Sequence, residues 1–121
     1  MMETIILSLA AFLSERHAEA VVVYDVAEKS SVTDAIVLAS AKNTVHLKAL
    51  AESVSRWLAE HRAEGDAAGL YPSPRVSGMA DSGWLVLDCN TIIIHLLTEE
   101  MRIRYELDSL FEKRAAQILH V

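Results

Sequence analysis

The residues that could carry chemistry in this chain are five histidines, one cysteine and several aspartates. No two histidines stand four positions apart, the helical spacing at which paired imidazoles bind zinc. Cys89 is the only cysteine, so the sequence has no CxxC motif and no internal disulfide. GxSxG, Walker and GxGxxG motifs are also absent. From these residues we predict no catalytic set, no metal site and no cofactor.

One segment places polar groups among aliphatic ones. The run WLVLDCNTIIIHLL, residues 84–97, is typical of a β-hairpin whose two loop residues are Cys89 and Asn90, a register in which Trp84 opposes His95. One face is then entirely aliphatic, and it consists of Leu85, Leu87, Ile92, Ile94 and Leu96. The other face carries an aromatic ring, a carboxylate and an imidazole, a mixture typical of an interface rather than of a dry core.

The polar residues of this hairpin admit two interpretations. In the structural one, His95 stacks on Trp84, and Asp88 stabilises the turn. In the functional one they face a partner, and protonation of His95 should weaken binding as the pH falls through about 6.5. A nucleophilic pair of Cys89 and His95 is not expected, because six residues of strand separate them by roughly 20 Å.

The elements that must position the hairpin follow from periodicity and capping signals. Apolar residues at helical spacing predict an amphipathic helix near the N-terminus rather than a signal peptide, since Glu3 stands where a basic residue would be expected. Asn43 or Thr44 can cap a helix within residues 41–61, and Thr98 can cap a final helical region. Further predictions are strands over residues 20–26, 35–40, 84–88 and 91–97, a loop over residues 63–78 with a short edge strand near 75–77, and two short helices within 101–119.

This order of elements predicts a mixed α/β (α+β) fold, in which helices flank a single mixed sheet in one domain, residues 1–121. The formal net charge of -6 disfavours direct DNA or RNA binding and suits a basic partner. No apolar run approaches the roughly 20 residues of a membrane span, and a lone cysteine fits a reducing compartment. A cytoplasmic protein without membrane contact is the simplest expectation.

Two segments carry a combination of residues that is specific, although each residue alone is common. The first, SGWLVLDCNTIIIHLLTEEMRIRYELDSLF, supplies Trp84, Asp88, His95, Arg102, Tyr105, Leu107 and Leu110. The second, YDVAEKSSVTDAIVLAS, supplies Asp25, Ser31, Thr33 and Asp34. This combination resembles the ribosomal silencing factor family, also called Iojap-like. The sequence departs from the family pattern at Ala41, Lys42, Asn43, Val45, Ser77, Cys89, Asn90 and Phe111.

The resemblance implies a fold akin to the nucleotidyltransferase superfamily, but no catalysis, because ASAKN lacks the Gly-Ser loop of those enzymes. It implies a cytoplasmic, ribosome-associated repressor that binds the fourteenth large-subunit ribosomal protein and blocks joining of the small subunit. It also makes a homodimer plausible. With the mixed hairpin face, it predicts partner contacts at Trp84, Leu85, Asp88, Cys89, Asn90, His95, Arg102 and Tyr105.

Three alternatives stay open at this level. The chain could be a nucleotide-binding or nucleotidyltransferase-type enzyme with displaced acids at Asp25, Asp34 or Asp88. It could act chiefly through self-association, with Ile93, Leu97 or the final helices as the contact. Arg102 could serve only in an ion pair with Glu99 or Glu106, or could meet Asp88 across the fold.

Overall fold

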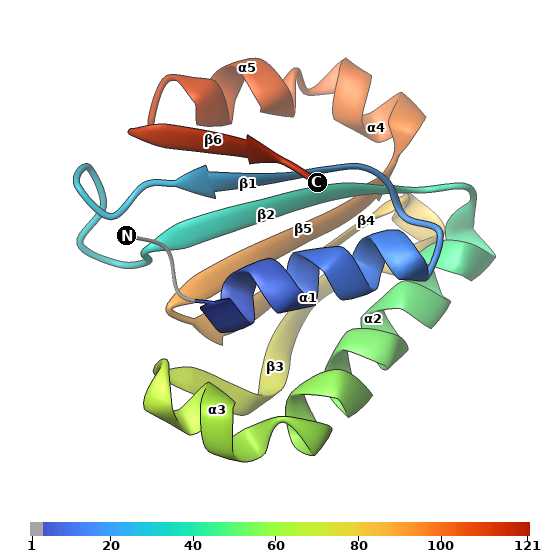
Figure 1. Ribbon diagram of the computed structural model, residues 1–121. Helices are drawn as coiled ribbons and strands as arrows, with labels where there is room; N and C mark the ends of the chain where they lie inside the picture. The colour runs from blue at the N-terminus through green and yellow to red at the C-terminus, as the bar shows by residue number, and fades with distance from the viewer. Residues whose placement is uncertain (1–3) are drawn as a thin grey trace.

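The computed structural model describes residues 4–121, in which six strands form one sheet with helices on both faces (Figure 1). The strand order is β3-β4-β5-β2-β1-β6, and only the β2–β5 pair among the five neighbouring pairs of these residues is parallel. The strands are β1 (Glu19–Asp25), β2 (Ala35–Ala41), β3 (Leu70–Met79), β4 (Trp84–Asn90), β5 (Ile92–Thr98) and β6 (Gln117–His120). The helices are α1 (Thr4–Glu15), α2 (Thr44–Glu60), α3 (Arg62–Ala67), α4 (Glu99–Arg104) and α5 (Leu107–Glu112), with a short 3₁₀ helix at Ala80–Ser82. The predicted mixed sheet flanked by helices is confirmed.

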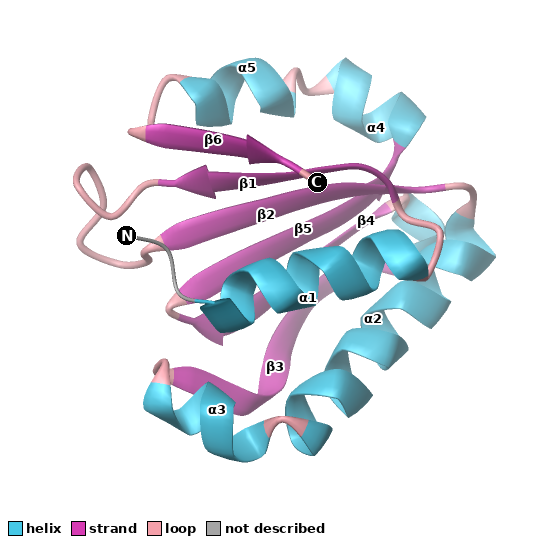
Figure 2. Cartoon of the chain, viewed as in Figure 1, coloured by secondary structure: helices cyan, strands magenta, loops and turns pink. Residues whose placement is uncertain are grey.

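Each face of the sheet has its own hydrophobic core. Helices α1 and α2 cover one face, and α4 and α5 cover the other (Figure 2). Strand β1 contributes to both cores, because Val21 and Val23 pack with the first pair of helices while Val22 and Tyr24 pack with α5. Burial on both sides explains why this strand reads as a continuous apolar run rather than as an alternating one. No helix within residues 4–121 is long and apolar enough to cross a membrane.

The capping predictions hold at both tested helices. Asn43 is the N-cap of α2, where its side chain accepts a hydrogen bond from the His46 amide at 2.8 Å. Thr98 is the N-cap of α4, and its hydroxyl accepts from the Met101 amide at 3.4 Å. The first predicted helix is confirmed as α1, although Glu3 lies outside the described residues. Asn43 therefore defines the start of α2.

The region predicted as a loop over residues 63–78 is more regular than expected. It contains α3 and the ten-residue strand β3, which includes Pro72 and Pro74. The pairing of β3 with β4 shifts between Leu70 and Arg75, where both prolines lie. β3 is an edge strand of the sheet, so prolines without an amide hydrogen are tolerated there. The prolines and glycines that indicated a loop are thus features of an irregular edge strand.

The C-terminal region contains the two predicted short helices, α4 and α5, and one strand that the sequence did not reveal. Residues 117–120 form β6, which pairs antiparallel with β1 at the far edge of the sheet from β3 (Figure 1). The helical region predicted over residues 101–119 therefore ends too late. A strand of four residues carries too little alternation to be recognised in the sequence.

Candidate partner-binding site

The β4–β5 hairpin differs in register from the prediction but keeps the predicted faces. Trp84 pairs with Leu97 and Val86 pairs with His95, a shift of two residues from the expected pairing. In this register the turn is at Asn90 and Thr91 rather than at Cys89 and Asn90, so it is displaced by one residue. The Asn90 side-chain amide donates to the Gly69 carbonyl at 2.8 Å, which ties the turn to the start of β3. A shift of two leaves every side chain on its original face, since successive residues of a strand alternate.

The aliphatic face is buried as predicted, and two proposed partner contacts belong to it. Leu85 and Cys89 lie in the core beneath α1 and α2, with exposed fractions of 5% and 0%. Both side chains therefore act as core residues in this structure, and neither is exposed for the predicted partner contact. Burial also raises the pKa of the Cys89 thiol to about 12. Leu97, considered for self-association, is likewise buried, in the core under α5.

The mixed face holds a cluster of rings that come from β4, β5, α5 and the connection between α4 and α5. Trp84 Nε1 donates to His95 Nδ1 at 3.2 Å, although the two residues are diagonal rather than directly opposed. The Tyr105 ring centroid lies 5.2 Å from that of Trp84, and the Phe111 centroid lies 5.0 Å from that of His95. We call Trp84, His95, Tyr105 and Phe111 the aromatic cluster. The predicted Trp84–His95 contact is present. Tyr105 and Phe111, from the α4–α5 segment, pack against these two rings.

Burial changes the expected chemistry of His95. Desolvation lowers the pKa of its imidazole to about 4, so the ring is neutral at neutral pH. Because Nδ1 accepts the indole hydrogen of Trp84, the proton of the neutral ring is on Nε2. The pKa of His95 thus lies below the value of 6.5 expected from the sequence. The structural interpretation, in which His95 contacts Trp84, accounts for the position of the ring.

Asp88 and Asn90 form the tip of the hairpin. The Asp88 carboxylate accepts a hydrogen bond from the Asn90 amide at 2.9 Å, which is the turn role that the structural interpretation assigned to it. Asn90 adopts a φ of 79°, a left-handed conformation that asparagine tolerates better than most residues. Asn90 is exposed and Asp88 is half-buried, on the same face of the sheet as Trp84. Both remain available to a partner.

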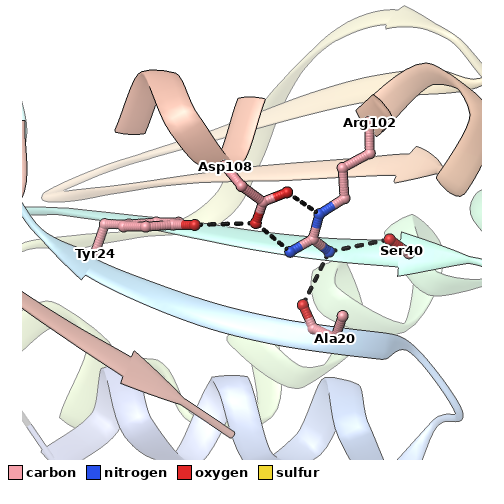
Figure 3. Close-up of polar contacts among 5 residues, drawn as sticks. All are labelled: Ala20, Tyr24, Ser40, Arg102 and Asp108. Atoms are coloured by element: carbon pink, nitrogen blue, oxygen red, sulfur yellow. Dashed lines mark hydrogen bonds and ion pairs between the residues drawn. The ribbon is translucent and has the colours of Figure 1, made fainter. Parts of the chain in front are cut away.

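Arg102 does not lie on the surface and does not form the predicted pairs. Its side chain is buried, and its guanidinium makes two hydrogen bonds to the Asp108 carboxylate, at 2.8 and 2.7 Å (Figure 3). It also donates to the Ala20 carbonyl at 2.9 Å and to the Ser40 hydroxyl at 3.0 Å. The ion pair with Glu99 or Glu106 and the contact with Asp88 are therefore wrong, because the fold buries this arginine between α4, α5 and the sheet. We call this arrangement the Arg102 clamp.

The Arg102 clamp pairs the positive guanidinium of Arg102 with the negative carboxylate of Asp108. Hydrogen bonds from Arg102 lower the pKa of the Asp108 carboxyl, and that carboxylate also accepts from the Tyr24 hydroxyl at 3.1 Å. Burial, followed by the charge of Asp108, raises the pKa of Tyr24. Asp108, Tyr24 and Ser40 could not be recognised from the sequence, because their contacts join segments as far as 84 residues apart and leave no local signal.

The aromatic cluster presents one exposed ring beside the acidic turn of the hairpin. Tyr105 is 52% exposed, so its phenol ring is open to a partner while Trp84 beside it is half-buried. Residues 4–121 contain no group of three or more histidine, cysteine, aspartate or glutamate side chains that could hold a metal ion. An exposed aromatic ring backed by oriented rings and an acidic turn is an arrangement suited to protein recognition.

Comparison with known proteins decides the family. The sequence pattern described as "Ribosomal silencing factor during starvation" matches residues 2–120. The chain belongs to this ribosomal silencing factor family. Relatives include the ribosomal silencing factor of Treponema pallidum, 28% identical over 87% of each chain. The corresponding protein of Zymomonas mobilis is 29% identical over 82% of this chain and 68% of its own.

A third relative of the ribosomal silencing factor chain comes from an animal. It is the mouse protein named "Mitochondrial assembly of ribosomal large subunit protein 1", 27% identical over 88% of this chain. The chain spans only 45% of the length of that relative.

Solved structures show the same fold. A protein from Chromobacterium violaceum superposes with a TM-score of 0.72 at 20% identity, covering 93% of this chain and 88% of its own. A protein from Bacillus halodurans gives a TM-score of 0.65 at 19% identity, covering 89% of this chain and 94% of its own. The mixed sheet of this ribosomal silencing factor family member is therefore shared with proteins of quite different sequence.

Proposed function

We propose that this protein binds the large ribosomal subunit through the fourteenth large-subunit ribosomal protein, blocks joining of the small subunit and thereby represses translation. The observation that carries the proposal is the family match over residues 2–120. The names of the relatives support it, since two are ribosomal silencing factors and one is named for assembly of the mitochondrial large subunit.

The surface that we propose for this contact consists of Trp84, Asp88, Asn90, His95 and Tyr105. Tyr105 supplies the exposed ring, and His95 holds the Trp84 indole in one orientation by accepting its N–H. Rigid aromatic residues are frequent hot spots, because they bury a large apolar area at a low cost in side-chain entropy. The net charge of -6 favours approach of a basic ribosomal protein.

We propose that this contact is non-catalytic and needs no cofactor. Two of the three acids considered for an enzyme have local roles. Asp25 accepts from the Ala27 amide at 3.2 Å, and Asp88 accepts from the Asn90 amide. Calorimetry with nucleoside triphosphates and magnesium tests the enzyme alternative. Saturable binding that is lost when these acids are replaced would support an enzyme.

Co-sedimentation with purified large subunits tests the ribosome contact. We expect Tyr105→Ala to weaken binding about thirtyfold, because truncating an anchoring aromatic residue typically costs about 2 kcal/mol. Val45→Ala is the matched control, since Val45 is 78% exposed on α2, on the other side of the sheet, and should bind as the wild type does. Wild-type protein that fails to pellet with large subunits at low salt would contradict the proposal.

We further propose that self-association, which family membership makes plausible, uses the exposed apolar residues of the α4–α5 segment. Ile103, Tyr105 and Leu110 are 67%, 52% and 41% exposed. Because Tyr105 also belongs to the proposed ribosome contact, a dimer formed through it would compete with the ribosome. Light scattering over a dilution series, with wild type and Ile103→Ser, measures whether the dimer exists and whether this segment forms it.

A further inference from the structure

A cavity of about 660 Å³ opens between two segments that the proposed function does not use. One is the connection between β1 and β2, and the other is the C-terminal end of α5, at the same end of the sheet (Figure 1). Lys29 Nζ donates to the Lys113 carbonyl at 3.3 Å and so ties the connection to the helix end. A volume of this size lies within the range of small-molecule sites, roughly 300–1,000 Å³.

The inner part of the cavity is apolar and partly aromatic. Ile36 from β2 and Ile93 from β5 line it, together with the rings of Phe111 and His95. The two rings lie 5.0 Å apart between centroids, at an angle of 46°. Apolar and aromatic walls favour a ligand with a flat hydrophobic body.

The polar side chains available in this cavity are hydrogen-bond donors. Ser30 Oγ already accepts from two backbone amides, those of Val32 and Thr33, which leaves its own O–H to donate. His95 uses Nδ1 as an acceptor for Trp84, so its Nε2–H is the second donor. None of the described residues that line the cavity is acidic. A ligand must therefore supply acceptor atoms.

Two cations complete the arrangement. Lys29 and Arg114 line the cavity and are both exposed, which places their charges at its mouth. Within residues 4–121 the ion pairs are Arg102–Asp108 and Arg104–Glu100, so neither cation at the mouth is paired. Both charges are therefore available to an anionic ligand at the mouth of the cavity.

We propose that this cavity binds a small organic phosphate with a flat apolar body. The body would lie against Phe111, Ile36 and Ile93, and the phosphate would accept from Lys29, Arg114 and Ser30. A phosphate suits the site because its oxygens are acceptors for the hydrogen-bond donors of the cavity. Its negative charge of about two is attracted by Lys29 and Arg114. Occupancy would also be felt at Trp84, because the His95 ring both lines the cavity and accepts the indole N–H.

Titration with 1-naphthyl phosphate tests this site on the isolated protein, so its outcome is independent of ribosome binding. Calorimetry gives the affinity, and NMR follows the indole N–H resonance of Trp84. We expect saturable binding that shifts this resonance, and affinities at least tenfold lower for 1-naphthol and for inorganic phosphate. Lys29→Gln and Arg114→Gln should each weaken binding about tenfold, the effect of one charge-assisted contact. Lys48→Gln, which removes an exposed lysine of α2, is the matched control and should bind as the wild type does.

Three results would each overturn the proposal. The first is the absence of saturable binding of 1-naphthyl phosphate to the wild type. The second is a Lys29→Gln, Arg114→Gln double variant that binds as tightly as the wild type does. The third is inorganic phosphate that binds as tightly as the aryl phosphate, since the apolar walls would then contribute nothing. Circular dichroism of each variant excludes loss of folding as the cause of weaker binding.

Discussion

At the scale of single residues, His95 illustrates how the fold alters a side chain that looks reactive in the sequence. The imidazole is neutral because partial burial between Trp84 and Phe111 penalises its charged form. A neutral ring can accept the Trp84 N–H at Nδ1, whereas a doubly protonated ring could not. The same residue therefore orients the indole and depends on staying uncharged to do so.

This dependence predicts how stability varies with pH. An unfolded histidine titrates near pH 6.5, whereas the pKa of folded His95 is about 4. Between pH 6.5 and pH 4 the His95 side chain is protonated in the unfolded chain but neutral in the folded one, which favours unfolding. The stability that the neutral ring contributes is therefore fully present above pH 6.5 and is lost as the pH falls towards 4. The loss should approach about 1.4 kcal/mol per pH unit within this window. Urea unfolding of wild type and His95→Gln at several pH values measures it.

The test is the difference in unfolding free energy between the wild type and His95→Gln. His95→Gln should be less stable than the wild type at pH 7, and the gap should narrow as the pH falls. A gap that stays constant from pH 7 to pH 5 would show that the histidine is readily protonated in the folded protein, contrary to its buried position.

The residue contacts of the site could be predicted only where they are local. The Trp84–His95 contact follows from alternation along a hairpin, and it survives the error in register because that error is even. The Arg102 clamp could not be predicted, since it depends on how α4 and α5 return to β1 and β2. Burial of Leu85 follows from the aliphatic face on which it was predicted, whereas Cys89 was predicted in the turn and is buried because the register is shifted.

At the scale of elements, the Arg102 clamp attaches α4 and α5 to the sheet. These helices have six residues each, too few to be stable alone, so their position depends on tertiary contacts. Tyr105 lies in the connection between them, followed by Glu106 with a φ of 48°. The clamp spans this connection from Arg102 to Asp108 and therefore fixes the exposed ring of Tyr105.

Breaking the clamp should destabilise the protein and loosen this segment. Asp108→Ala leaves the buried Arg102 guanidinium without its carboxylate, and we expect a loss of about 2–4 kcal/mol in the free energy of unfolding. Tyr24→Phe removes only one hydrogen bond to Asp108 and should cost about 1 kcal/mol. The control is Glu100→Gln at the exposed Arg104–Glu100 pair, which should change stability by less than about 0.5 kcal/mol. Equal losses from Asp108→Ala and Glu100→Gln would contradict a stabilising clamp.

Elements with strong periodicity or caps were predictable, whereas β3 was predicted only as a short edge strand near residues 75–77 and β6 was not predicted. α2 is recognisable from its apolar stripe and from the Asn43 cap. β3 and β6 lie at the two edges of the sheet, where a strand needs partners on one side only. Prolines and a short length are tolerated there, so these strands lose the signals by which central strands are recognised.

At the scale of the whole molecule, the net charge of -6 and the aromatic cluster should act on different steps of binding. Long-range attraction accelerates the approach of a basic partner, whereas the buried aromatic contact slows dissociation. Screening reduces the first effect, since the Debye length falls from about 30 Å at 0.01 M salt to about 10 Å at 0.1 M. The two contributions can therefore be separated by changing the salt concentration.

We expect association with large subunits to slow as salt rises, while dissociation changes little. Asp88→Asn should reduce the salt dependence of the association rate, because it removes a charge beside the proposed contact. Glu60→Gln removes the same charge from the end of α2, on the other side of the sheet, and should have a smaller effect because screening limits its reach. Stopped-flow fluorescence of Trp84 in a Trp57→Phe background follows both rates. Equal salt dependence in the two charge variants would mean that only the total charge matters, and that Asp88 does not lie near the partner.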